Sequence, residues 1–325
     1  MRQSPRQLCA PALWGESRGR AALRGGLASG AATRGGDSMK RTLLFFLMLL
    51  AGIVCTAQAS RVVTDETGRK VTVPDHPHRV VCLVPSVTDT VFALGSGDDV
   101  VAVSDYTTYP PVALKKPSIG SLVNPSIETI LSFHPDLVVG TSIPGAAETA
   151  AKLNTVGVPV YLVDPHGLAG ILHSVDSVGE ALNRVPEATA LNASLTRRIA
   201  AVKARTAGKP ALKVLVPVWY DPIITIGKHA FITEIIEAAG ARSVTDDLIP
   251  DWPQISMETV VARAPDALLL FRGGKVSIDI LRQRPGWNSL PAIQADKVYY
   301  VNSGIQESSP VAIDALEELA REFHP

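Results

Sequence analysis

The spacing of hydrophobic and polar residues predicts short buried strands that alternate with helices. The runs VVCLV at 80–84 and ALLLF at 267–271 are apolar throughout, as expected for strands covered on both faces. Helical segments end at glycines, in VTDTVFALG at 87–95 and FITEIIEAAG at 231–240. LKVLVPVW at 212–219 is interpreted as one strand. This alternation predicts an α/β fold with parallel sheets.

A helix-and-strand segment occurs twice along the chain. The first copy is SIETILSFHPDLVV, from 126, and the second is SMETVVARAPDALLL, from 256. At one constant separation the copies share Ser126/Ser256, Glu128/Glu258, Thr129/Thr259, Pro135/Pro265 and Asp136/Asp266. The simplest architecture is therefore two similar α/β lobes, preceded by a polar hairpin with a Thr-Gly turn.

The predicted organisation places an N-terminal lobe at 60–167, a linking helical segment at 168–208 and a C-terminal lobe at 209–325. The linking segment holds a helix, a proline-marked break and a long amphipathic helix, with no strand candidate. Ligands of α/β sheets bind at the carboxyl ends of strands, so we expect a ligand cleft between the lobes.

The residues before 60 have the pattern of an export signal. An unbroken apolar run, 43–54, follows a Lys-Arg pair and precedes an Ala-x-Ala site. We interpret 39–59 as a signal peptide cleaved near Ala59, and 1–38 as a non-native extension before the initiator Met39. Cys55 could carry a lipid anchor, but a small residue normally precedes a lipidated Cys and here it is Val54, so we favour a soluble, cleaved periplasmic protein.

The composition excludes some classes of function. The chain has a formal net charge of zero, which argues against nucleic-acid binding. Removal of 1–59 takes away eight basic and two acidic residues and leaves 23 basic and 29 acidic ones, a net charge of −6. No P-loop, G-x-S-x-G elbow, dinucleotide fingerprint or H-E-x-x-H is present, so we favour a binding protein over a hydrolase or metal-dependent enzyme.

Histidines are weak candidates for a metal site. His134, His166 and His229 fall near predicted element ends and could converge on zinc or manganese. No acidic or His-rich loop accompanies them, so we favour surface or capping positions and expect no metal site. Arg272 begins an Arg-Gly-Gly turn after a strand and is a candidate anion contact, although a plain turn explains the glycines.

Aromatic residues are few, and several lie in predicted loops or at strand ends on the expected cleft side. There they would offer flat apolar faces to a ligand; for Trp219 a core position is an equal alternative. The candidates are Tyr106, Tyr109, Trp219, Tyr220 and Trp252.

The repeated glutamates, Glu128 and Glu258, follow a serine that can cap a helix. A carboxylate in the first turn is stabilised by the helix dipole by about 0.3–1 kcal/mol, which explains each glutamate locally. Their occurrence at matched positions of two lobes suggests a second role, as two contact points for a pseudo-symmetric partner.

The chain resembles the periplasmic substrate-binding proteins of ABC importers for cobalamin and ferric siderophores, over residues 61–325. The resemblance rests on the paired glutamate segments, SDYTTYPP at 104–111, DWPQIS at 251–256 and PGWNSLPAIQADKVYYV at 285–301. It implies two Rossmann-like lobes bridged by one long rigid helix, no enzymatic activity and no resident cofactor. By position, Glu128 and Glu258 match glutamates that dock onto the two permease subunits, and Tyr106 and Trp252 match aromatics that pack on the corrin ligand.

The final loop departs from the cobalamin branch of that family. Ser303 and Glu307 stand where cobalamin binders carry an aspartate and an arginine. We still favour a corrinoid as cargo of a monomeric binding protein, with a ferric siderophore or haem as the alternative within the family and a zinc or manganese ion as a further one.

Overall fold

The computed structural model describes residues 59–121 and 125–325 and opens with an antiparallel hairpin of β1 (Ser60–Thr64) and β2 (Lys70–Pro74). The buried Asp65 carboxylate orders its turn, because it accepts hydrogen bonds from the backbone N–H of Arg69, at 2.9 Å, and from the Arg69 guanidinium. The predicted hairpin is thus confirmed. The predicted N-terminal extension, the apolar run of the signal peptide and Cys55 lie outside the described residues.

The first lobe is built on a four-stranded parallel sheet, in the order β4-β3-β5-β6. Strands β3 and β6 are buried at every residue, as their unbroken apolar sequences predict. The elements are β3 (Val80–Cys82), α2 (Pro85–Ala93), η1 (Gly97–Asp99), β4 (Val100–Val103), η2 (Ala113–Lys115), α3 (Ile127–Ser132), β5 (Leu137–Thr141), α4 (Ala146–Thr155) and β6 (Val160–Val163).

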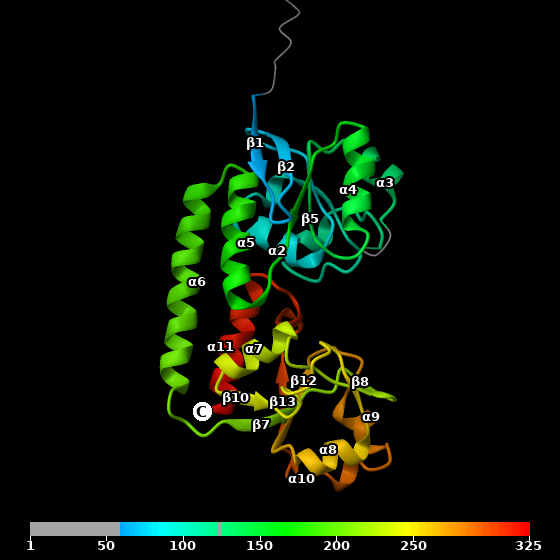
Figure 1. Cartoon of the computed structure of the whole chain (residues 1–325), viewed down its shortest axis with the longest axis vertical. Helices are drawn as coiled ribbons and strands as arrows, with labels where there is room; N and C mark the ends of the chain where they lie inside the picture. Colours follow the sequence, from blue (N-terminus) through cyan, green and yellow to red (C-terminus); the bar gives the residue numbers. More distant parts are fainter. Residues whose placement is uncertain (1–58, 122–124) are drawn as a thin grey trace, which may run out of the picture. The chain divides into compact units, whose positions relative to one another are not determined.

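The second lobe repeats this architecture, with the parallel order β10-β7-β12-β13 (Figure 1). In both sheets the first strand of the lobe lies between its second and third strands. The elements of this sheet and its helices are β7 (Leu212–Leu215), α7 (Phe231–Ala238), β10 (Ala241–Ser243), α8 (Met257–Arg263), β12 (Ala267–Phe271), α9 (Ile278–Arg282), η3 (Trp287–Ser289), α10 (Pro291–Gln294), β13 (Val298–Val301), η4 (Ser303–Gln306) and α11 (Val311–Phe323).

A small antiparallel sheet belongs to the second lobe alone. It has the order β11-β9-β8, with β8 (Trp219–Tyr220), β9 (Ile223–Ile224) and β11 (Gln254–Ile255). The interpretation of 212–219 as one strand was therefore wrong. Strand β7 ends at Leu215, and Pro217, which has no backbone N–H to donate to a ladder, lies between it and β8.

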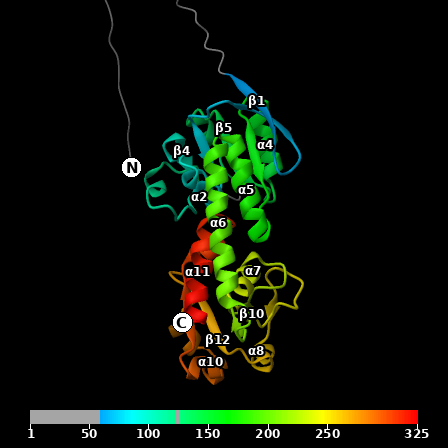
Figure 2. The same ribbon diagram turned by 90° about the vertical axis from the view of Figure 1, so that its left-hand side faces the viewer.

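Two helices connect the lobes, α5 (Gly167–Ala181) and α6 (Val185–Thr206). They break where Asn183 adopts a left-handed backbone, at φ 58°, and α6 restarts with a proline in its first turn. At 22 residues α6 is about 33 Å long. It lies beside α11 (Figures 1 and 2), to which the Arg198 guanidinium is bound through Asp314 and Glu317.

The repeat noticed in the sequence is a repeat of backbone conformation. Strands β5 and β12 begin and end at corresponding positions of the two copies. Before each, His134 and Ala264 both adopt the left-handed conformation, at φ 46° and 49°. The same chain reversal therefore connects helix to strand in both lobes, despite two different side chains.

The repeated aspartates bind the edge of a neighbouring strand. Asp136 accepts hydrogen bonds from the backbone N–H groups of His78 and Arg79, at 2.8 and 2.9 Å, just before β3. Asp266 accepts one from the N–H of Lys213, at 3.0 Å, in β7. Each aspartate thus sets the register between the third and first strands of its lobe.

Candidate functional site

The most exposed aromatic side chains among the candidates follow the carboxyl ends of sheet strands. Tyr106 and Tyr109 lie in the loop after β4 and are 54% and 44% exposed. Trp252 lies between β10 and β11 and is 52% exposed. Exposed aromatic rings are favourable contacts for a ligand or partner, so these three are candidate ligand contacts, two from the first lobe and one from the second.

Trp219 and Tyr220 are half-buried and are engaged with each other. Their rings stack with centroids 5.0 Å apart at 18°. The Trp219 indole N–H donates to the backbone oxygen of Asp221 at 2.9 Å, and the Arg284 guanidinium lies 4.7 Å above the Tyr220 ring. Arg284 and Trp219 thus both lie against the Tyr220 ring. A ligand that contacts this pair would therefore lie against the outer face of Trp219.

Tyr220 and Arg284 also line a pocket of about 260 Å³ in the second lobe. Its walls are mostly apolar, and the buried Trp287 belongs to them. Met257, the first residue of α8, is another wall residue.

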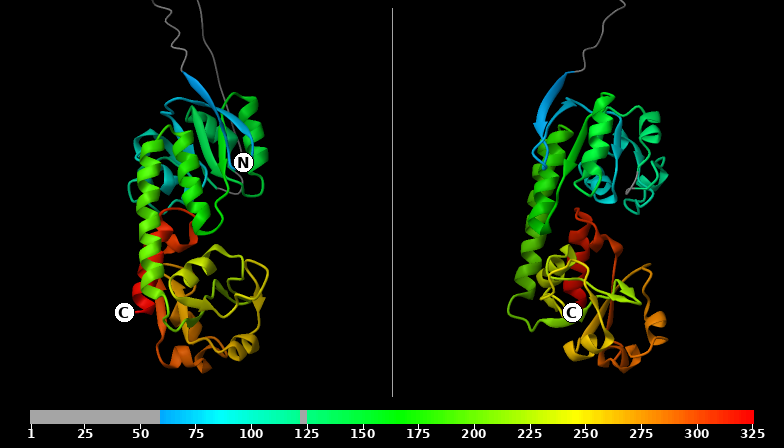
Figure 3. Two further views of the ribbon diagram at one scale, coloured as in Figure 1. Left: turned by 60° about the vertical axis from the view of Figure 1, so that its left-hand side comes forward. Right: turned by 45° about the vertical axis from the view of Figure 1, so that its right-hand side comes forward.

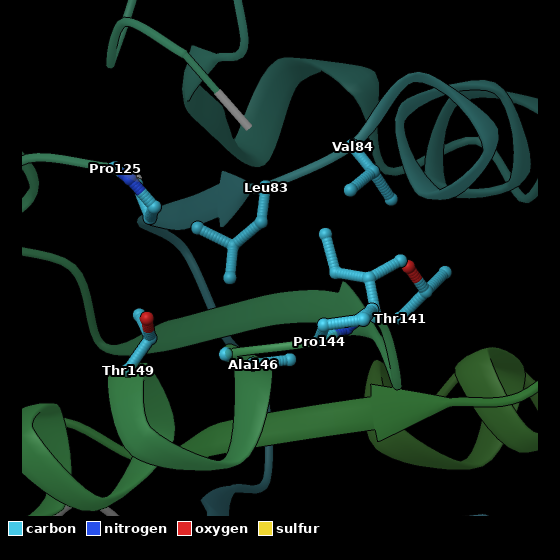
Figure 4. Close-up of a pocket in the computed structure, with 9 residues that line it drawn as sticks. Leu83, Val84, Pro125, Thr141, Pro144, Ala146 and Thr149 are labelled. Atoms are coloured by element: carbon cyan, nitrogen blue, oxygen red, sulfur yellow. The ribbon is translucent and has the colours of Figure 1, made fainter. Parts of the chain in front are cut away.

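A second recess lies in the first lobe, at the carboxyl ends of β3 and β5 (Figure 4). It encloses about 10 Å³, the space of a single water molecule, because Leu83 points across it toward β5. A Cβ at Gly140 would lie 2.9 Å from Leu83 Cδ1, so glycine in β5 permits this packing. This recess is therefore too small to hold a large ligand. Its lining residues are Leu83, Val84, Pro125, Thr141, Ile143, Pro144, Gly145, Ala146 and Thr149.

Arg272 is tied into the framework of the second lobe. Its guanidinium is paired with the Glu318 carboxylate of α11. Glu318 also accepts a hydrogen bond from the side-chain amide of Asn302, at 3.0 Å. Glu318 therefore fixes the positions of both Arg272 and Asn302. The sequence prediction that Arg272 contacts an anionic ligand requires this ion pair to be shared or broken.

An acidic group lies where the two lobes meet, at the start of α11. Asp89 of α2 is 4% exposed, and burial raises the pKa of its carboxyl. Glu307 lies in the loop before α11, where burial and then the nearby Asp89 charge raise its pKa to about 7. Burial and then the charges of Asp89 and Asp314 also raise the pKa of the Tyr109 hydroxyl.

The two repeated glutamates are exposed in the first turns of α3 and α8. Ser126 accepts a hydrogen bond from the N–H of Thr129 at 3.1 Å, and Ser256 accepts one from that of Thr259 at 3.2 Å. The predicted serine caps are thus confirmed. A hydrogen bond from the Ser256 hydroxyl lowers the pKa of the Glu258 carboxyl.

The histidine candidates do not come together. His134 is exposed at the end of α3, His166 is paired with Asp164 at 3.1 Å and His229 is exposed before α7. Within residues 59–121 and 125–325, no group of three or more His, Cys, Asp or Glu side chains is arranged to hold a metal ion.

The sequence did not point to Asp89 as part of this region, although it singled out Glu307 as a departure from a family pattern. The available signal was the alignment of VTDTVFALG with FITEIIEAAG, which places an acidic residue after a threonine in both. An acidic residue on an otherwise apolar helix face becomes buried when that face packs, so it needs a hydrogen-bond donor as its partner.

Two similar parallel-sheet lobes, a long connecting helix and exposed aromatics after the sheet strands define a bilobal solute-binding protein. The pattern of the periplasmic binding protein family matches residues 80–304, and the chain belongs to that family. Members of this family are binding proteins for ABC transport, not enzymes, and they work with a membrane permease.

The chain is similar to named relatives over most of its length. An uncharacterized ABC transporter substrate-binding lipoprotein of Bacillus subtilis, YvrC, is 31% identical over 81% of this chain and 85% of its own. The vitamin B12-binding protein of Salmonella choleraesuis is 30% identical over 74% of this chain and 88% of its own. Among solved structures, the periplasmic haem-binding protein RhuT of Roseiflexus sp. RS-1 superposes with a TM-score of 0.70 at 29% identity, over 76% of this chain and 98% of RhuT.

The family is periplasmic or lipoprotein-anchored. Among the helices of residues 59–121 and 125–325, none has the length and apolar character needed to cross a membrane.

Proposed function

We propose that this protein captures a corrinoid, a cobalamin-like ligand, and delivers it to the permease of an ABC importer. The observation that carries the proposal is the set of exposed aromatics contributed by both lobes, Tyr106, Tyr109 and Trp252. Flat rings of this kind suit a large planar macrocycle. Relatives named as vitamin B12-binding proteins at up to 30% identity support the same ligand class.

The acidic group favours a corrinoid over haem or an anionic ferric siderophore. Corrinoids carry amide side chains, which donate hydrogen bonds, whereas haem carries two propionate carboxylates. Glu307 offers a carboxyl group in the loop before α11. Arg272, which could pair with an anion, is already bound to Glu318. Carboxylate oxygens accept amide N–H groups and repel other carboxylates.

Haem is the second candidate, because Tyr109 is an exposed tyrosine and tyrosine is one of the protein ligands of haem iron. The similarity to RhuT supports this alternative. Removal of the Glu307 charge should have opposite effects on the two ligands. It should weaken corrinoid binding, because an amide contact is lost, and strengthen haem binding, because repulsion of a propionate is relieved.

Ligand titration of residues 60–325 tests the proposal. Cyanocobalamin, cobinamide, haem and a ferric siderophore are each added while tryptophan fluorescence is followed, with the haem absorption band as a second readout. We expect saturable quenching by a corrinoid. Trp252→Ala should weaken corrinoid binding at least tenfold, whereas Ile249→Ala, at a 74% exposed residue of the same loop, should leave it unchanged. Tight haem binding with no corrinoid response would overturn the ligand class.

The proposal assigns Glu128 and Glu258 to permease docking, one per lobe. Their exposure and matched helix positions support this role. Paired with arginines on the two permease subunits, they would fix orientation and speed association. We expect the double change Glu128→Ala with Glu258→Ala to retain ligand affinity and to abolish uptake through the cognate importer in proteoliposomes. Glu322→Ala, at an exposed carboxylate of α11, is the matched control.

Export is part of the proposal, with cleavage near Ala59 yielding a soluble periplasmic monomer. Sequencing the N-terminus of the mature protein tests it, and Ser60 is the expected first residue. A lipid-modified Cys55 at that terminus would instead show membrane anchoring, as in the relative described as a lipoprotein.

A further inference from the structure

Asp89 of the first lobe caps a helix of the second lobe. Its Oδ2 atom accepts a hydrogen bond from the backbone N–H of Val311 at 2.9 Å. Val311 is the first residue of α11, and the residue before it, Pro310, supplies no side-chain acceptor. The first N–H groups of a helix have no partners within the helix, so the start of α11 obtains one of its partners from α2. Figure 3 shows the start of α11, in red, directed toward the first lobe in both views.

Glu234 of the second lobe makes the converse contact. Its Oε2 atom accepts a hydrogen bond from the backbone N–H of Leu168, also at 2.9 Å. Leu168 lies in the first turn of α5, whose preceding residue His166 gives no side-chain cap. A Cβ on Gly167 would lie 2.2 Å from Oε2, and Gly167 has φ 67°, so glycine at this position lets the carboxylate approach.

The two contacts are related by the duplication of the lobes. Asp89 and Glu234 both follow a threonine and both stand six residues before the glycine that ends their segment, Gly95 or Gly240. They lie on α2 and α7, the first helix of each lobe. The helices that they cap, α11 and α5, follow β13 and β6, the fourth strand of each sheet. The first helix of each lobe therefore caps the helix that leaves the fourth strand of the other.

Such a crossed pair resists relative movement of the lobes. A carboxylate at a helix N-terminus gains a charge-assisted hydrogen bond and a favourable interaction with the helix dipole. The lobes are joined by α5 and α6 and share apolar packing with α7 and α11. The two caps are directional polar contacts at separate points, and they add to this packing in restricting rotation of one lobe against the other. Both lobes belong to one compact unit, Gln58–Pro325.

We propose that Asp89 and Glu234 are paired positioning residues, a crossed latch that holds the two lobes in the register in which their loops share one ligand. The effect on ligand affinity rests on the proposed function, but the effect on lobe coupling does not. Neither residue needs to touch the ligand.

Backbone amide hydrogen exchange, measured by NMR on residues 60–325, tests the latch. We expect Asp89→Ala to accelerate exchange at Val311, the amide that it caps, and also at Leu168, by about tenfold each. Glu234→Ala should accelerate exchange at the same two amides. Asp89→Asn and Glu234→Gln keep an acceptor oxygen and should largely restore protection. These conservative variants also supply the test if an alanine variant fails to fold.

The matched control is Ser126→Ala, which removes a cap within one lobe and should accelerate exchange at Thr129 while leaving Leu168 and Val311 unchanged. Acceleration confined to the amide that each acid caps would overturn the latch, because two independent caps give that result. Cyanocobalamin affinity is measured on the same variants and should fall about tenfold in each alanine variant. Absence of corrinoid binding by the unchanged protein would refute the proposed function, and the exchange result would still decide the latch.

Discussion

Glu307 makes the folded protein less stable as its carboxyl group ionises, and Glu307→Gln should reverse that effect. Burial and the Asp89 charge raise the pKa of Glu307 from 4.5 to about 7. The folded state therefore holds this proton over a pH range in which the unfolded chain has lost it. The contribution of Glu307 to stability must therefore fall as the pH rises from 4.5 through 7 and level off above that range.

The size of the effect follows from the shift in pKa. One pKa unit corresponds to 1.36 kcal/mol, so the rise to about 7 costs about 3 kcal/mol when the carboxyl group is ionised in the fold. Glutamine carries no charge at any pH. The free energy of unfolding of Glu307→Gln should therefore exceed that of the unchanged protein by up to about 3 kcal/mol more at pH 8 than at pH 4.5.

Urea unfolding followed by circular dichroism between pH 4.5 and pH 8 measures this difference. The other titrating groups are common to both proteins, so the difference between the two curves reports the ionisation of Glu307 together with its coupling to Asp89. Glu322→Gln, which changes an exposed carboxyl group of α11, should run parallel to the unchanged protein. A difference between Glu307→Gln and the unchanged protein that stays constant across this pH range would refute the reasoning.

Three further changes test the framework by urea unfolding. Ser126→Ala removes the acceptor for the Thr129 N–H and should cost about 1 kcal/mol, with Ser126→Asp close to neutral; no loss would contradict the capping role. Asp136→Ala leaves two backbone N–H groups without their charged acceptor and should cost about 2 kcal/mol, and equal stability would show that water replaces it. Gly227→Ala places a Cβ 1.8 Å from the backbone oxygen of Pro250 and should lower the free energy of unfolding by about 3 kcal/mol. Unchanged stability would show that the backbone at Pro250 can move away without cost.

Much of the framework could be predicted from the sequence because its signals are local. Buried parallel strands have unbroken apolar runs, and a serine three residues before a free N–H is a recognisable cap. The constant separation of the repeated segments predicted two matched lobes, and the corresponding bounds of β5 and β12 confirm it. The fold class and the binding-protein family were correct for this reason.

The remaining features depend on contacts between distant residues. The hydrogen bond from Val311 to Asp89 joins residues 222 positions apart, and no local pattern encodes it. The pairing of Arg272 with Glu318 likewise appears only after α11 has packed beside β13. The small β8–β9–β11 sheet was missed because strands of two residues are too short to show a period.

The unequal connections within the two lobes have an evolutionary consequence. Two residues, Leu83 and Val84, join β3 to α2, whereas the corresponding connection from β7 to α7 contains the β8–β9 hairpin. The first lobe instead has its long connection between β4 and α3, where Tyr106 and Tyr109 lie. The two lobes thus have their longest connections at different places, while both sheets have the same strand order. Under the proposed function, substitutions in these two connections can change cargo preference while both sheets and the exposed glutamates of α3 and α8 stay the same.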